Sequence, residues 1–183
     1  MEKIGQGTFR EVFTYPDNPE QLVVKVPRQG AEKYGRIMNQ EEHRAAQLYP
    51  DLFPAVHNSD WDALVVDRAD TFQGSPGDMP RFFPGVQRVI EIGSVKDPWL
   101  LLREMLRLHT GKTPIHDARK EFGLRRKVIA RIAGSDPTLS ELADAVKNLE
   151  IDIKDITEMN TGVSRRTGKF VLVDASTMAG FRG

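Results

Sequence analysis

Three polar residues near the C-terminus have types and spacing that suit phosphoryl transfer. Asp155 precedes Asn160 by five residues, and Asp174 follows Asn160 by 14 residues at the end of an apolar run. One aspartate can orient an attacking hydroxyl, while an amide oxygen and a second carboxylate bind one divalent ion. The polar segment 164–169 predicts a hairpin turn that brings Asn160 and Asp174 together. Because such loose spacing also arises by chance, a polar loop followed by a buried strand is the alternative.

The composition predicts a globular chain without disulfides. The 183 residues include 26 Lys or Arg and 26 Asp or Glu, and the hydrophobic fraction of 39% is enough for a sizeable core. This balance gives no overall charge argument for a nucleic acid or a membrane as partner. Cysteine is absent, and neither a signal peptide nor an apolar run of bilayer length is seen. We therefore expect a cytoplasmic protein that does not associate with membranes.

Two glycines near the N-terminus lie in or beside a predicted hairpin. Gly5 and Gly7 precede a strand that begins near Val12, and a second strand covers 22–26 after a turn at 16–19. Rossmann and Walker loops need a helix after their glycines, so this order argues against both. A glycine-rich hairpin can instead cover phosphates with its backbone N–H groups.

A lysine interrupts the second strand. Lys25 stands among valines, where burial of its charge is costly unless the ammonium is paired. The alternative is an edge-strand lysine that points to water. In the helix predicted over 32–49, Glu41 shares the expected inward stripe with Ile37 and Leu48, so we favour Glu41 as the partner of Lys25. Glu42 then becomes the solvated neighbour, although the choice between the two glutamates stays open.

These features together resemble the protein kinase superfamily. After the helix come two short strands, 53–57 and 63–67, which complete an order of three strands, a helix and two strands. The glycine loop, Lys25 and a helical glutamate resemble the N-terminal lobe of kinases. The segment 154–160 with Asp174 resembles their catalytic loop and metal-binding aspartate. The resemblance implies an α+β fold in one domain. Residues 1–70 would form an antiparallel sheet with one helix and the hinge, and 71–183 a reduced, mainly helical lobe that ends just after the metal-binding aspartate.

The resemblance also implies roles for individual residues, with ATP and Mg²⁺ as cofactors. Asp155 would orient the acceptor hydroxyl, and Lys25, held by Glu41, would bind the α- and β-phosphates. The Asp67 carbonyl and the Ala69 N–H would face the adenine. The residues implied in nucleotide binding are Gly5, Gly7, Val12, Lys25, Asp67 and Ala69, and those implied in metal binding are Asn160 and Asp174.

The chain departs from the kinase pattern in places. Asp155 follows Asp67 by 88 positions, about twice the usual interval, and Arg10 stands where a third glycine is common. Thr157 replaces a frequent lysine, for which Arg165 or Lys169 could substitute. Among kinases the pattern is most similar to small kinases of bacteriophages and to small bacterial effector kinases. This implies a serine/threonine protein kinase in the bacterial cytoplasm, which acts on host or phage proteins and on itself.

The middle of the chain predicts helices. Asp97 followed by Pro98 caps one helix that ends near His109, a second covers about 115–133, and Asp136 opens a third. The third helix has a buried stripe made of Leu139, Leu142, Ala143, Val146 and Leu149. Residues 71–85 read as a loop, and 86–92 are ambiguous between strand and helix.

A basic segment offers a rival function. Residues 101–135 contain nine Lys or Arg against three acids. The halves 118–124 and 125–132 resemble a helix-turn-helix with Gly123 at its turn, and Arg125, Arg126 and Lys127 could contact nucleic acid. An amphipathic helix pair with a solvated basic face is the alternative, and docking of an acidic protein is a further one.

Overall fold

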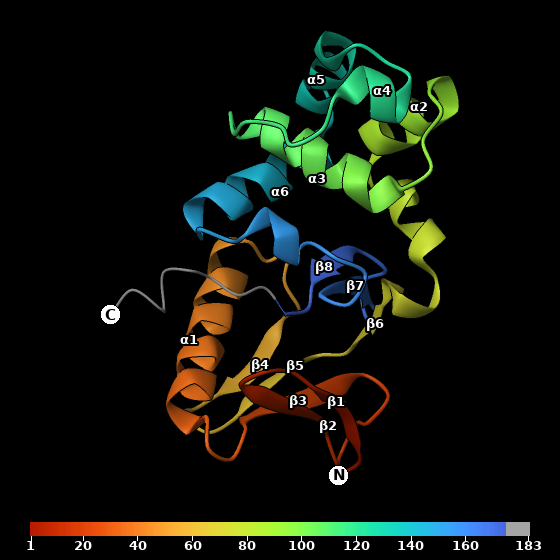
Figure 1. Ribbon diagram of the computed structural model, residues 1–183. Coiled ribbons are helices and arrows are strands. Elements are labelled where there is room, and N and C mark those ends of the chain that lie inside the picture. Colours follow the sequence, from red (N-terminus) through yellow and green to blue (C-terminus); the bar gives the residue numbers. More distant parts are fainter. Residues whose placement is uncertain (175–183) are drawn as a thin grey trace. The chain divides into compact units, whose positions relative to one another are not determined.

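The computed structural model describes residues 1–174 and shows an α+β fold made of two compact units (Figure 1). The first unit comprises Met1–Thr71 and the described residues from Asn160 on, and the second comprises Phe72–Met159. The sequence predicts one domain with an N-terminal lobe over 1–70 and a second lobe over 71–183. The C-terminal segment, however, belongs to the first unit instead of the second, because its strands pair there.

The first unit contains a five-stranded antiparallel sheet in the order β1-β2-β3-β5-β4. Its strands are β1 (Lys3–Gln6), β2 (Arg10–Thr14), β3 (Leu22–Pro27), β4 (Val56–Ser59) and β5 (Leu64–Asp67). Val23, Leu64 and Val66 form a buried apolar cluster on it. The predicted order of strands is confirmed, and it places the glycines in the β1–β2 hairpin.

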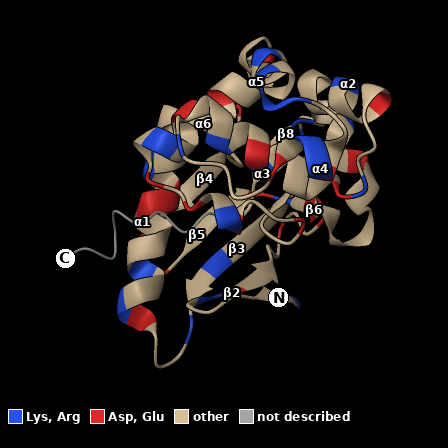
Figure 2. Ribbon diagram, turned by 45° about the horizontal axis from the view of Figure 1, so that its top comes forward, with Lys and Arg blue, Asp and Glu red and all other residues tan. Residues whose placement is uncertain are grey.

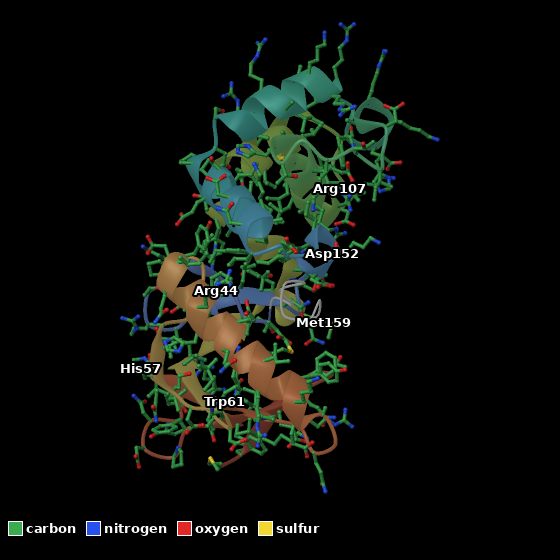
Figure 3. The ribbon with its side chains drawn as sticks, turned by 90° about the vertical axis from the view of Figure 1, so that its left-hand side faces the viewer. Arg44, His57, Trp61, Arg107, Asp152 and Met159 are labelled. Atoms are coloured by element: carbon green, nitrogen blue, oxygen red, sulfur yellow. The ribbon has the colours of Figure 1, made fainter. Side chains whose placement is uncertain are left out.

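Helix α1 (Glu32–Leu48) packs against β3 and β4 with a different face from the one predicted. Figure 3, which labels Arg44 on this helix, shows α1 lying along the sheet. Leu48, expected inside, is 57% exposed. The buried face is instead marked by Gly35, Met38 and Glu42. A Cβ on Gly35 would lie 2.7 Å from backbone atoms of Phe9 and Pro27, so this glycine lets the helix approach the sheet closely and fixes its rotation.

A second, three-stranded antiparallel sheet completes the first unit. It consists of β6 (Ala69–Thr71), β7 (Thr161–Ser164) and β8 (Phe170–Leu172), in the order β6-β7-β8. The β7–β8 turn is closed by the Gly168 N–H, which donates to the Ser164 carbonyl over 2.8 Å. The hairpin predicted over 164–169 is therefore confirmed.

The second unit is helical. It contains the 3₁₀ segments η1 (Phe72–Gly74), η2 (Pro76–Phe82) and η3 (Ile153–Asp155), and the helices α2 (Pro84–Ile92), α3 (Pro98–His109), α4 (Ala118–Phe122), α5 (Arg126–Gly134) and α6 (Pro137–Asn148). The predicted loop over 71–85 thus contains two 3₁₀ segments, and the ambiguous segment 86–92 is helical. In the part of the chain that is described, no helix has the length and apolar character needed to cross a membrane.

Two of these helices begin after a capping aspartate, at the positions that the sequence predicts. The Asp97 carboxylate accepts from the N–H groups of Trp99 and Leu100 at 2.9 and 3.0 Å. Asp136, only 2% exposed, accepts from the Leu139 N–H at 3.0 Å and also from the Gly85 N–H at 2.6 Å. One buried carboxylate therefore satisfies backbone donors of both α6 and α2. The predicted stripe of α6 is buried throughout.

The prediction of a single helix over 115–133 is wrong, because the segment contains two helices. Gly123 adopts a left-handed φ of +70° and ends α4, after which α5 begins at Arg126. The helix-turn-helix interpretation of the same segment placed its turn at this glycine, and that break is observed.

Candidate functional site

The glycine hairpin lies beside the carboxylate of Asp174. A Cβ placed on Gly7 would lie 3.3 Å from Asp174 Oδ2, and the Gly7 N–H donates to the Arg10 carbonyl over 2.8 Å. A Cβ on Gly5 would contact Val12 at 3.6 Å, so this glycine faces its own hairpin. The structure thus brings Gly7 next to a predicted metal ligand, in space that a larger side chain would fill.

Lys25 is a buried, paired lysine and not an edge-strand lysine. Its side chain is 3% exposed, and Nζ lies 2.6 Å from Glu42 Oε1. Nζ also donates to the Val173 carbonyl over 2.5 Å. The ammonium therefore links strand β3, helix α1 and the segment that leads into Asp174.

The predicted partner Glu41 is wrong, and Glu42 is the residue that pairs with Lys25. Because Gly35 seats α1 closely on the sheet, Glu42 rotates inward and its side chain is 6% exposed. The Glu41 side chain is 23% exposed and lies 3.6 Å from Arg44 on the same helix. The error is one position along the helix.

Arg10, which sequence reasoning did not assign to the site, is central to it. It is 4% exposed, and its Nη1 lies 2.7 Å from Glu42 Oε2 while its Nη2 donates to Asp174 Oδ1 over 2.8 Å. Nη1 also donates to the Asn39 Oδ1 over 3.3 Å. We call Arg10, Lys25, Glu42 and Asp174 the charge cluster. A signal was present, since an arginine at the start of a strand replaces the expected third glycine.

The charge cluster contains two cations and two anions, which balance. Burial lowers the pKa of the Lys25 ammonium, against the opposing effect of the Glu42 carboxylate beside it. Burial also acts to lower the pKa of Arg10, but its ion pairs with Glu42 and Asp174 outweigh that effect and raise the pKa. Arg10 therefore stays charged, while Lys25 depends on Glu42 for its charge.

The predicted metal ligands Asn160 and Asp174 are brought together by the β7–β8 hairpin. The Asn160 carbonyl accepts from the N–H groups of Val173 at 2.8 Å and Asp174 at 3.3 Å. The Asp174 side chain is 39% exposed, and its Oδ2 faces the space left by Gly7. One carboxylate and one amide oxygen suit Mg²⁺, which keeps waters and shares substrate phosphates. Within residues 1–174, no group of three or more His, Cys, Asp or Glu could hold a metal alone.

Asp155, the predicted catalytic residue, belongs to the second unit. It ends η3, and its N–H donates to the Asp152 carbonyl over 2.8 Å. Its approach to Asn160 and Asp174, which belong to the first unit, stays a prediction.

The predicted hinge residues lie where β5 ends and β6 begins. The buried Asp67 carboxylate lies between His57 Nε2 at 2.7 Å and Arg166 Nε at 2.6 Å. Ala69 starts β6 and is paired with Ser164 of β7. The Asp67 side chain therefore joins the two sheets of the first unit, and backbone contacts of Asp67 and Ala69 with a base stay a prediction.

Two cations suggested as substitutes for the lysine missing at position 157 are engaged elsewhere. Arg165 lies 2.8 Å from Asp70 and 3.0 Å from Glu20, and Lys169 lies 2.7 Å from Asp51. These ion pairs fasten the β7–β8 hairpin to the rest of the first unit.

Comparisons with protein-family models, with curated proteins and with solved structures found no match to this chain. The function is therefore inferred from the geometry of the charge cluster and from the sequence pattern.

Proposed function

We propose that this protein is an ATP-dependent phosphotransferase with a kinase-like fold, which transfers the γ-phosphate to serine or threonine hydroxyls of proteins, including its own. The observation that supports this best is the buried pair of Lys25 and Glu42, at 2.6 Å, beside the glycine hairpin and Asp174. Burial of a lysine inside a sheet is costly, and the fold holds this one with a dedicated carboxylate. Such an arrangement suits a cation that binds phosphate.

The residues of the first unit can bind and orient the nucleotide. Backbone N–H groups of the glycine hairpin would cover the phosphates, and Lys25 would contact the α- and β-phosphates while Glu42 holds its ammonium in place. The Asp174 carboxylate and Asn160 would hold Mg²⁺, which when bound neutralises phosphate charge. The fit is supported by the space that Gly7 leaves beside Asp174.

Asp155 would act on the acceptor. Its carboxylate would orient a serine or threonine hydroxyl and accept the hydroxyl proton as the new O–P bond forms. The bond between the γ-phosphorus and the bridging oxygen breaks at the same centre, and ADP leaves with the electron pair. In this scheme the chain supplies positioning and charge and forms no covalent intermediate.

The test is transfer of label from γ-labelled ATP in Mg²⁺ buffer, by purified protein alone and with bacterial lysate. We expect labelled protein bands that fall by roughly 100-fold or more in Asp155→Asn and in Asp174→Asn. Asp144→Asn, an exposed aspartate of α6, is the matched control and should label normally. Normal labelling by Asp155→Asn or Asp174→Asn would refute the assignment.

A second candidate function is nucleic-acid binding by the second unit. Six exposed cations of α4, α5 and the turn between them form what we call the basic surface: Arg119, Lys120, Arg125, Arg126, Lys127 and Arg131. Figure 2 shows the basic segments on these helices. None of the six forms an ion pair within the described residues, whereas Phe122 and Ile129 on the opposite faces are buried.

The start of α5 favours an anionic partner. Arg125, Arg126 and Lys127 are consecutive at its N-terminus, where no side chain caps the helix and no acid occupies the first turn. Cations at this end oppose the helix dipole, so the segment carries an unfavourable term that bound phosphates would offset. Phosphate contacts by arginine and lysine are the main source of affinity for nucleic acids.

A further inference from the structure

We propose that Arg10 competes with Mg²⁺ for Asp174: it holds this carboxylate when no nucleotide is bound, and it has to release it when the metal–nucleotide complex binds. The inference rests on the proposed function, because it concerns loading of the same site. Arg10 thereby controls the Mg²⁺ concentration at which nucleotide binds tightly.

The competition follows from one short contact. Arg10 Nη2 lies 2.8 Å from Asp174 Oδ1, so a guanidinium charge already sits on the carboxylate that the metal would use. A guanidinium keeps its charge in proteins, so Arg10 cannot leave by losing a proton. Mg²⁺ binds carboxylate oxygens at about 2.0–2.1 Å and sheds water reluctantly, so a nearby cation opposes its arrival. The side chain of Arg10 has to move for the full charge of Asp174 to become available.

Arg10 has partners that would remain after such a move. Its Nη1 lies 2.7 Å from Glu42 Oε2 and donates to Asn39 Oδ1 over 3.3 Å. The guanidinium carries five donors in a fork, so release of one carboxylate leaves it paired. The two carboxylate partners of Arg10 also differ in exposure, since the Glu42 side chain is 6% exposed and the Asp174 side chain is 39% exposed. An ion from solvent can therefore reach the ion pair at Asp174.

A buried donor indicates that the observed arrangement is not fully satisfied. Asn39 is 0% exposed, and its Nδ2 has no hydrogen-bond partner within residues 1–174. Buried amide nitrogens are nearly always paired, so this donor lacks an acceptor that a change in the neighbouring ion-pair network could supply. The amide oxygen of the same side chain, Oδ1, is the acceptor that would keep the guanidinium after its release from Asp174.

The same residue connects the metal ligand to the phosphate-covering hairpin. Arg10 is the first residue of β2, and its carbonyl accepts from the Gly7 N–H. Mg²⁺ and nucleotide should therefore bind cooperatively, because movement of Arg10 is linked to the hairpin that covers the phosphates.

The test measures binding and not activity. Calorimetry on the 183-residue chain gives the dissociation constant of a non-hydrolysable ATP analogue at a series of free Mg²⁺ concentrations. We expect Arg10→Gln to lower the Mg²⁺ concentration for half-maximal tight binding by about tenfold or more, because repulsion between a guanidinium and a divalent ion a few ångströms away persists under water-like screening. Arg36→Gln, which removes an exposed arginine of α1 paired with Asp62, is the matched control and should leave it unchanged.

A second variant covers the case in which Arg10→Gln does not fold. Arg10→Lys keeps a cation beside Glu42 but lacks the fork that reaches a second carboxylate, so it should also shift the Mg²⁺ dependence to lower concentrations. An unchanged or raised Mg²⁺ requirement in the folded variants overturns the role of Arg10 while leaving the proposed function intact. Absence of analogue binding in the wild type at every Mg²⁺ concentration overturns both.

Discussion

At the scale of single residues, two adjacent glutamates of α1 have opposite environments. Glu42 Oε1 pairs with Lys25, whereas Glu41 is partly exposed beside Arg44. Glu42→Gln leaves Lys25 and Arg10 as buried cations with one carboxylate fewer. We expect this substitution to lower the free energy of unfolding by about 3–5 kcal/mol, as when one partner of a buried ion pair is removed.

The matched substitution Glu41→Gln should change the free energy of unfolding by less than about 1 kcal/mol, since it weakens a partly exposed pair on one helix. Chemical denaturation of both variants measures the difference, and calorimetry reports whether each binds the ATP analogue. Equal destabilisation by the two changes would contradict the assignment of Glu42 as the partner of Lys25.

The residues that sequence reasoning placed correctly are those with distinctive local surroundings. Lys25 stood out among valines, and Asp174 ended an apolar run. The choice between Glu41 and Glu42 depended on the rotation of α1, which is set by the contact of Gly35 with the sheet. A helical stripe is wide enough to include neighbours on either side, so periodicity alone could not resolve one position.

At the scale of elements, the turn between α4 and α5 depends on a left-handed glycine. Gly123 has φ +70°, and a Cβ there would lie 3.4 Å from the Ser94 backbone nitrogen. Gly123→Ala should therefore lower the free energy of unfolding by about 1–2 kcal/mol. Gly134 is the last residue of α5, and an added Cβ there would point into open space. Gly134→Ala should therefore leave the free energy of unfolding unchanged or raise it by up to about 1 kcal/mol. Thermal unfolding of the two variants measures the difference. Equal midpoint temperatures would exclude strain at position 123.

Elements with local signals were predictable, and those defined by tertiary contacts were less so. Asp97 and Asp136 each precede a proline, which marks a helix start directly. The break at Gly123 was harder to place because apolar periodicity continues on both sides of it. The second role of Asp136, as acceptor for the Gly85 N–H, joins residues 51 positions apart and left no local trace.

At the scale of the whole molecule, the order of elements was predictable but their grouping was not. Strand β7 pairs with β6 and β8 pairs with β7, so both belong to the first unit, although the second unit separates them from β6 in the sequence. The hairpin itself could be predicted from its turn. Its attachment depends on long-range pairs such as Arg166 with Asp67, which no local pattern reveals.

The charge of the whole chain sharpens the test of the basic surface. The formal net charge is zero, so salt-sensitive binding of an anionic polymer has to come from a local concentration of cations. We expect the protein to bind a fluorescent random-sequence DNA duplex, with an affinity that falls steeply between low and physiological salt. Replacement of Arg125 and Arg126 by glutamine should weaken binding and reduce the slope of log affinity against log salt by about 1 for each phosphate that the protein no longer neutralises.

The matched control replaces two exposed lysines outside the basic surface, Lys33 of α1 and Lys147 of α6. It removes the same charge from the molecule and should leave both affinity and slope unchanged. Fluorescence anisotropy over a series of salt concentrations measures binding by the wild type and by both double variants.

If the control reduces the slope as much as the Arg125 and Arg126 double variant does, binding is a diffuse property of the molecular surface. If none of the proteins binds the duplex at low salt, nucleic-acid binding is rejected. The exposed cations of α5 would then remain as a candidate docking face for an acidic protein substrate.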